Sequence, residues 1–233
     1  MIEVRSLTEH AEFEEAVALQ KTIWGFEELE LLPVRLFVVA TKVGGQVFGA
    51  FDDGRMVAFL LAIPGIKAGG KHYLHSHMMG VLKDYRNAGI GRMLKLKQRE
   101  EALSRGIDLI EWTFDPLEVK NAFFNIERLG AVVRRYVLNQ YGTTTSLLHG
   151  GLPTDRCVAE WYIAETRERP PELARIVIPH AIQDWKTTDP ARALETQASI
   201  STQFQEHFRA GLAVIGFERG ETEGAYILGK WHS

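Results

Sequence analysis

The feature that most constrains the fold is a strand–loop–helix–strand succession in the middle of the chain. HYLHSHMMGV, residues 72–81, is typical of a strand, and residues 91–105 of a helix that Gly106 ends. DLIEWTF, residues 108–114, follows as a second strand. Strands joined through a helix tend to lie parallel, whereas the apolar runs on either side of DDG, residues 52–54, predict an antiparallel hairpin. The sequence therefore predicts an α+β fold whose mixed sheet is mostly antiparallel and is flanked by helices.

The remaining elements continue this arrangement up to a charged boundary, and a further set of elements follows it. ETRERPPEL, residues 165–173, combines charges with two prolines, which is typical of a linker. We therefore expect a domain over 1–165 and a C-terminal α/β extension over 166–233. The extension contains a strand in RIVIP, a helix that Asp189 caps and Pro190 opens, and two final strands. Before the boundary we expect a strand at 2–5, helices at 6–24, 33–43 and 120–129, and strands at 131–141 and 156–164.

Charge and cysteine usage exclude several classes of function. The net charge of −3 gives no general footprint for nucleic acid. Cys157 is the only cysteine, so an internal disulfide and CxxC metal sites are excluded, and no metal is expected. The acidic N-terminal stretch has no apolar run, and no apolar stretch reaches membrane-spanning length. We expect a cytoplasmic protein without a membrane or nucleic-acid partner.

The loop before the central helix predicts an anion site. In DYRNAGIGRMLK, residues 84–95, Gly89 and Gly91 stand where a helix begins, although each glycine costs about 1 kcal/mol relative to alanine. A bare backbone lets a phosphate approach the unpaired first N–H groups of the helix, and Arg86 and Arg92 can balance its charge. The pattern is neither a Walker A loop nor a complete dinucleotide fingerprint. A simple glycine-rich turn is the alternative, and Lys95, Lys97 and Arg99 are expected on a solvated helix face.

Two segments carry a family resemblance. VLKDYRNAGIGRMLKLKQREEAL resembles the coenzyme A-binding segment of the GNAT superfamily of acyl-CoA N-acyltransferases. AFFNIERLG, residues 122–130, is similar to the second hallmark segment of that superfamily, the helix that ends at Leu-Gly. The resemblance extends over residues 1–165 and agrees with the order of elements. It implies a V-splayed sheet, acetyl-CoA as the cofactor and acyl transfer to an amine.

The resemblance also implies roles for individual residues. Main-chain groups of Met79 and Val81 would pair with the pantetheine arm like a neighbouring strand, and Asn121 and Phe124 would border it. The pyrophosphate would lie on the backbone of the loop and the helix start, beside Arg86. The loop residues concerned are Asn87, Ala88, Gly89, Ile90, Gly91 and Arg92.

A pair of histidines offers the base that must take a proton from the amine. In an extended strand His75 and His77 project to the same face as Met79 and Val81. Imidazole titrates near working pH, which suits a proton acceptor. This His-x-His is similar to that of arylalkylamine N-acetyltransferases, which implies His77 as the base and His75 as its relay. Two polar residues on a partly wet sheet face are the alternative, and Glu111 is a competing base.

The acid that would protonate the leaving thiolate has no assignment. Many members of the superfamily carry a tyrosine four residues before the glycine of the second hallmark, and here that position is Ile126. Tyr136, Tyr141 or water are the alternatives.

Two functions are consistent with these features. The first is transfer of an acetyl or other acyl group from acetyl-CoA to a small primary amine or amino acid, by direct attack in a ternary complex. The second is a non-catalytic acyl-CoA-binding sensor or regulatory module, which the missing tyrosine favours. The extension holds an apolar set, Phe204, Phe208, Val214, Ile215 and Phe217, which we expect to pack on the rest of the chain, with a homodimer as the alternative.

Overall fold

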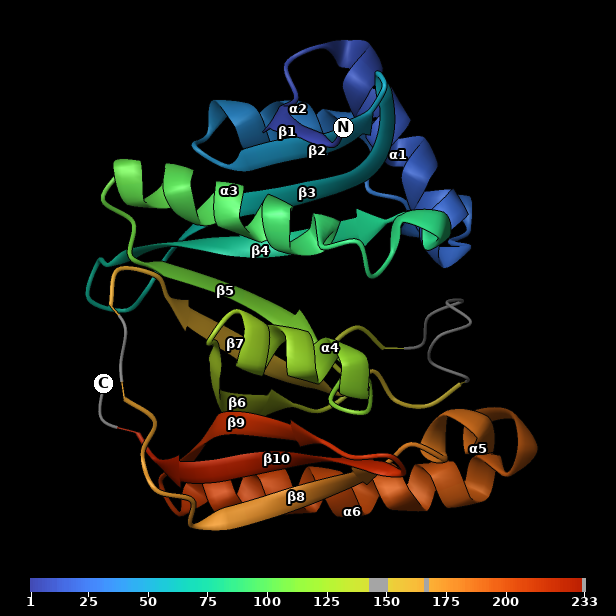
Figure 1. Ribbon diagram of the computed structural model, residues 1–233, viewed down its shortest axis with the longest axis vertical. Helices are drawn as coiled ribbons and strands as arrows, with labels where there is room; N and C mark the ends of the chain where they lie inside the picture. The colour runs from blue at the N-terminus through green and yellow to red at the C-terminus, as the bar shows by residue number, and fades with distance from the viewer. Residues whose placement is uncertain (143–150, 166–167, 232–233) are drawn as a thin grey trace. The chain divides into compact units, whose positions relative to one another are not determined.

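The computed structural model describes residues 1–142, 151–165 and 168–231. The chain divides into two compact units, Met1–Glu111 and Trp112–Ser233, and strand β5 (Leu109–Phe114) runs from the first into the second. In each unit the strands form a mostly antiparallel sheet that helices flank (Figure 1), and the first unit also contains a parallel pair. This confirms the α+β class predicted from the order of elements.

In the first unit the strands follow the order β1-β2-β3-β4-β5. All neighbours are antiparallel except β4 and β5, which are parallel, as expected for two strands joined through helix α3. The elements are β1 (Glu3–Ser6), α1 (His10–Trp24), the 3₁₀ turn η1 (Glu28–Glu30), α2 (Val34–Lys42), β2 (Gln46–Asp52), β3 (Arg55–Ile66), β4 (His72–Val81), the 3₁₀ turn η2 (Lys83–Tyr85) and α3 (Ile90–Ser104).

Helices cover both faces of this sheet. On one face Phe59 of β3 meets Trp24 of α1 and Phe37 of α2, with ring centroids 6.0 Å apart in both pairs. On the other face α3 lies across the strands (Figure 1), where Gln46 of β2 donates from Nε2 to the Gln98 carbonyl at 3.1 Å. Strands covered on both faces lose their alternation, which explains why all but the last residue of β2 is buried.

The segment between α1 and α2 is fixed at two points. The Phe26 ring stacks on Trp24 at 5.6 Å. The fully buried amide of Gln20 donates to the Leu32 carbonyl at 3.1 Å and accepts from the Leu32 N–H at 2.9 Å, as a neighbouring strand would. Between these points Leu29 is fully exposed. The segment is therefore anchored at its ends and open to solvent in its middle.

In the second unit the strands follow the order β5-β7-β6-β9-β10-β8. Three of them come from residues 166–233 and join the sheet at β6, where Val214 pairs with Val133. The elements are α4 (Val119–Phe123), the π-helical turn η3 (Phe124–Arg128), β6 (Val132–Val137), β7 (Arg156–Tyr162), β8 (Ala174–Pro179), α5 (Ile182–Thr188), α6 (Pro190–Arg209), β9 (Leu212–Arg219) and β10 (Glu223–Lys230). The helix α5 was not expected from the sequence.

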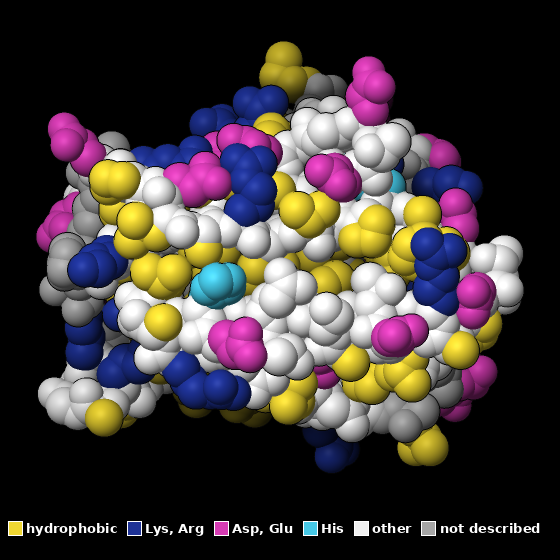
Figure 2. All heavy atoms as spheres, turned by 90° about the horizontal axis from the view of Figure 1, so that it is seen from below, with side chains coloured by type: hydrophobic (Ala, Val, Ile, Leu, Met, Phe, Trp, Pro, Cys, Tyr) yellow, Lys and Arg dark blue, Asp and Glu magenta, His cyan; other side chains and the backbone are white. Residues whose placement is uncertain are grey.

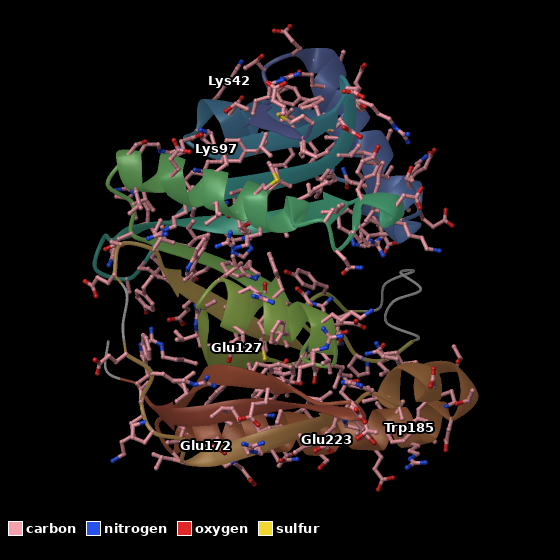
Figure 3. All side chains as sticks on the ribbon, viewed as in Figure 1. Lys42, Lys97, Glu127, Glu172, Trp185 and Glu223 are labelled. Carbon is pink, nitrogen blue, oxygen red and sulfur yellow. The ribbon has the colours of Figure 1, made fainter. Side chains whose placement is uncertain are left out.

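The C-terminal strands and α6 share an aromatic core with the rest of this unit. The Tyr226 ring lies 5.0 Å from Phe204 of α6 and 4.8 Å from Phe217, and its hydroxyl donates to the Pro116 carbonyl at 2.7 Å. The Glu127 carboxylate, labelled in Figure 3, accepts from the Phe217 N–H. These contacts fix β9 and β10 against residues that precede the linker.

Most of the apolar set that was expected to pack on the rest of the chain is buried. Phe204, Val214 and Phe217 are at most 2% exposed, and Phe208 and Ile215 are half-buried. Figure 2, which views the molecule from the side of β8 and α6, shows hydrophobic patches interspersed with charged side chains. Within the described ranges no helix has the length and apolar character needed to span a membrane.

A buried polar network provides a test of how α6 is held. The Ser201 hydroxyl donates to Asp155 at 2.6 Å, and the Tyr136 hydroxyl donates to the same carboxylate oxygen at 3.0 Å. Replacing Ser201 with alanine is expected to lower the free energy of unfolding by about 1–3 kcal/mol, because it removes a buried partner of a carboxylate. Urea denaturation measures this, with the exposed Ser199→Ala on the same helix as the control. Equal stability of the two variants would contradict the prediction.

Candidate active site

The histidine pair lies at an irregularity in β4. In the pairing with β3, Leu61 is opposite Met78 and Ala62 is opposite Ser76, so His77 is an extra residue on β4. This is a β-bulge, a feature that re-aims side chains and recurs beside active sites. The bulge places His77 outside the regular ladder between Ser76 and Met78.

The bulge also changes which side chains share a face. His75 is opposite Ile63 and Met79 is opposite Leu60, and these two β3 residues project to opposite faces of the sheet. The expected common face of the histidines with Met79 and Val81 is therefore wrong, because the extra residue reverses the alternation. The two histidines remain together, since their ring centroids lie 5.9 Å apart with 44° between the planes.

Both imidazoles are held in the neutral form. Burial lowers the pKa of His75 to about 4, with the neighbouring His77 and the cations Lys95 and Lys67 acting in the same direction and Glu111 acting against them. Burial also lowers the pKa of His77 below its usual value. A neutral imidazole has a free lone pair for a proton, although the lowered pKa makes each ring a weaker base than a free imidazole.

Glu111 lies directly beside this pair. On the parallel strand β5 it is in register with His75, and it is only 3% exposed. Its carboxylate accepts a hydrogen bond from Lys67, whose ammonium lies 4.7 Å from the centre of the Tyr73 ring. Glu111 is therefore a buried, paired carboxylate next to the histidines.

Beyond His75 the pairing of β4 with β5 ends. The register pairs of these strands are Leu74 with Ile110 and His75 with Glu111, whereas Met79 and Val81 are paired with β3. A strand with one unpaired edge can bind an extended ligand through its main chain. The Val81 carbonyl already accepts a bond from Arg86 Nε at 3.2 Å, which ties the next segment back to the strand.

The next segment, residues 87–92, is called the cradle because its backbone amides are unpaired at a helix start, within the part of the chain that the structure describes. Asn87 and Gly89 have φ of 66° and 82°, the left-handed conformation, and α3 begins at Ile90. The first amide of the helix to find an acceptor is that of Met93, which donates to the Gly89 carbonyl at 3.0 Å. Among the described residues no acceptor pairs with the amides of residues 87–92. Consecutive free N–H groups at a helix start fit a phosphate.

The basic residues that follow the cradle do not form one solvated face. Lys97, labelled in Figure 3, pairs at the surface with Glu100 at 3.0 Å, as expected. Lys95 is only 2% exposed, and its Nζ donates to Ser76 Oγ at 2.8 Å and to Gln98 Oε1 at 3.1 Å. The expectation of a solvated Lys95 is wrong, because this residue lies on the face of α3 that packs on the sheet.

Two residues of the second unit were expected to border the pantetheine arm. Asn121 is exposed and accepts from Asn125 Nδ2 at 3.1 Å, and Phe124 is half-buried at the start of the π-helical turn. Ile126, which stands at the position where the resemblance would place a tyrosine, is 4% exposed.

The two tyrosines considered as acids differ in their surroundings. Burial raises the pKa of Tyr136, and its hydroxyl is bonded to Asp155 and Ser201. Tyr141 is 47% exposed, and its hydroxyl lies 2.9 Å from Thr113 Oγ1. Tyr136 is therefore held in the core of the unit, whereas Tyr141 is a partly exposed residue.

The sequence also matches a known family model. Residues 11–130 match the acetyltransferase (GNAT) family, a span that includes β4, the cradle and the helix after β5. The chain belongs to the GNAT family of acetyltransferases. It is an acyl-CoA-dependent N-acetyltransferase whose cofactor is acetyl-CoA. The free amides of residues 87–92 fit the pyrophosphate of this cofactor.

Solved structures share the fold of this GNAT enzyme at low sequence identity. The ribosomal-protein-S18-alanine N-acetyltransferase of Escherichia coli matches with a TM-score of 0.55 and 19% identity, over 73% of this chain and 99% of that one. Aminoglycoside 6'-acetyltransferase type Ii matches with a TM-score of 0.56 and 18% identity, over 71% of this chain and 99% of that one. Arabidopsis thaliana Naa50 in complex with a bisubstrate analogue matches with a TM-score of 0.54 and 14% identity, over 68% of this chain and 97% of that one. No curated protein sequence gives a significant match.

Proposed function

We propose that this GNAT enzyme transfers an acetyl group to a small primary amine or amino acid by direct attack in a ternary complex. The observation that carries the proposal is the pair of neutral imidazoles, 5.9 Å apart, at the bulge of the strand that leads into the cradle. His77 is the base that takes the proton from the amine, and His75 relays it. When bound, acetyl-CoA supplies the thioester carbonyl that the amine attacks.

We assign most of the binding of acetyl-CoA to main-chain groups. The amides of residues 87–92 hold the pyrophosphate, and Arg86 and Arg92, both exposed at the cradle, balance its charge. Main-chain groups of Met79 and Val81 pair with the pantetheine arm along the edge of β4. Asn121 and Phe124 border the same arm.

The proton donor for the leaving thiolate is Tyr141 or water, because Tyr136 is committed to its buried network. Glu111 is retained as a competing base, since it is in register with His75. We also propose that residues 1–165 form the acetyltransferase part and that residues 166–233 are a C-terminal extension of it. A homodimer and a cytoplasmic location remain predictions.

A non-catalytic acyl-CoA-binding module is the second candidate, and the buried Ile126 at the tyrosine position favours it. Release of free thiol from acetyl-CoA across a panel of primary amines, amino acids and short peptides separates the two. The enzyme turns over with at least one small amine. A module binds coenzyme A to saturation, measured by calorimetry, and shows no amine-dependent release of thiol.

A further inference from the structure

The face of α3 that packs on the sheet carries a polar cluster where an apolar core is expected. Its members, Gln46, Ser76, Lys95 and Gln98, are at most 5% exposed. Burial lowers the pKa of Lys95 well below its ordinary value, because an ammonium that leaves water loses its hydration. Apolar residues of similar volume at such positions are often as stabilising or more so. The cluster therefore needs an explanation other than stability.

The hydrogen bonds of the cluster centre on Lys95. Its Nζ donates to Ser76 Oγ on β4 and to Gln98 Oε1 one turn along α3. Among the described residues, the buried atoms Gln46 Oε1 and Gln98 Nε2 have no hydrogen-bond partner. Buried polar atoms without partners are uncommon, and they often mark a functional requirement. Within the cluster, the bond from Lys95 to Ser76 is the one that reaches the histidine strand.

Ser76 occupies the decisive position on that strand. It lies between His75 and His77, and it is the last residue in register before the bulge. Its side chain is bonded to α3, whereas its neighbour His75 projects to the opposite face of the sheet. Lys95 therefore holds β4 from the α3 face of the sheet, next to the bulge that interrupts the pairing of β4 with β3.

We propose that Lys95 is a positioning residue of this enzyme, which clamps Ser76 so that the bulge keeps the His75 and His77 rings in their working arrangement. The inference rests on the proposed function of these histidines. It assigns to Lys95 a role that acts through β4, without contact with the amine or with acetyl-CoA.

The charges around His75 support this role. The charged groups that act on His75 are His77 on β4, Glu111 on β5, Lys67 between β3 and β4, and, from the opposite face of the sheet, Lys95 on α3. The neighbour on β3 is Ile63, and at Gly80 helix α1 presents Ile23 and Trp24. A positive charge on Lys95 opposes protonation of His75, so it favours the neutral imidazole.

The test compares Lys95→Met, which keeps the length of the side chain, with the control Lys97→Met on the surface of the same helix. NMR titration of the two imidazoles is the first measurement. In Lys95→Met the pKa of His75 is expected to rise above about 4, because one positive charge that lowers it is removed, while burial still holds it below its ordinary value. Lys97→Met is expected to titrate like wild type. The turnover number of Lys95→Met is expected to fall about 10- to 100-fold because the rings are misplaced.

A second pair of variants tests the clamp itself and does not depend on the folding of Lys95→Met. Ser76→Ala removes the acceptor and is expected to reproduce the loss of turnover, whereas Ser76→Thr keeps the hydroxyl and is expected to restore turnover. Wild-type turnover and imidazole titration in Ser76→Ala would overturn the proposal. The NMR titration needs no catalysis, so it still reports on Lys95 if His77→Ala shows that the histidines are not catalytic.

Discussion

His77→Ala is expected to lower the turnover number about 10²- to 10⁴-fold, the usual contribution of a general base. Affinity for coenzyme A is expected to stay near wild type, because the cradle amides lie on a different segment. The matched control is His72→Ala, an exposed histidine at the start of the same strand, which is expected to keep full activity. Steady-state kinetics with the best amine of the panel and calorimetry with coenzyme A measure both quantities.

The pH dependence follows from the direction of the pKa shifts. Because burial lowers the pKa of both imidazoles, the base form persists below pH 6.5 and is lost only when the pH falls through the lowered values. The acid limb of the wild-type kcat profile is therefore expected below pH 6.5. A His77→Ala enzyme with wild-type rate and profile would contradict the assignment. Glu111→Gln would then become the decisive variant, since Glu111 is the other base in register with His75.

Gly91→Val is expected to weaken coenzyme A binding about 100-fold or more. A branched side chain in the first turn of α3 would occupy the space from which the amides of residues 87–92 reach the pyrophosphate. Loss of two or more charge-assisted hydrogen bonds accounts for a change of this size. Isothermal titration calorimetry with coenzyme A measures it.

Gly91 is a better position for this test than Gly89. Gly89 has a φ of 82°, so any side chain there strains the backbone whatever it does to the ligand. Gly91 is not among the residues with positive φ, and a valine there is compatible with the helix. Met93→Val in the same turn controls for the effect of a β-branched residue on the helix. Unchanged affinity in folded Gly91→Val would refute the cradle.

Caps, prolines and glycines in the sequence were enough to predict where most helices and strands lie. Residues 72–81 form β4 within the bounds expected, and α3 begins one residue before Gly91. Asp189 caps α6 by accepting from the Arg192 N–H, with Pro190 as the first helical residue. Such signals are local, because a cap, a proline or a C-terminal glycine acts within one turn of its own position.

The features that the sequence did not predict arise from pairing and packing. The bulge at His77 exists only in the register of β4 with β3, which no single strand encodes. The burial of Lys95 could have been predicted from the helical period, since the residue falls on the same face of α3 as the buried Ile90, Leu94 and Ala102. The charge of Lys95 favoured a solvent-exposed position. The side chain is buried instead, where its ammonium donates a hydrogen bond to Ser76 of β4, a residue distant in sequence.

The two fixed ends of the segment between α1 and α2 have a consequence for the evolution of specificity. The Phe26 stack and the Gln20 amide clamp on Leu32 hold the ends, and Leu29 between them touches solvent alone. Surface substitutions away from such anchors usually change stability by less than about 0.5 kcal/mol. Residues 27–31 can therefore be randomised in a mutant library while Gln20 and Leu32 are kept, and new acceptor preferences can be selected without loss of folded protein.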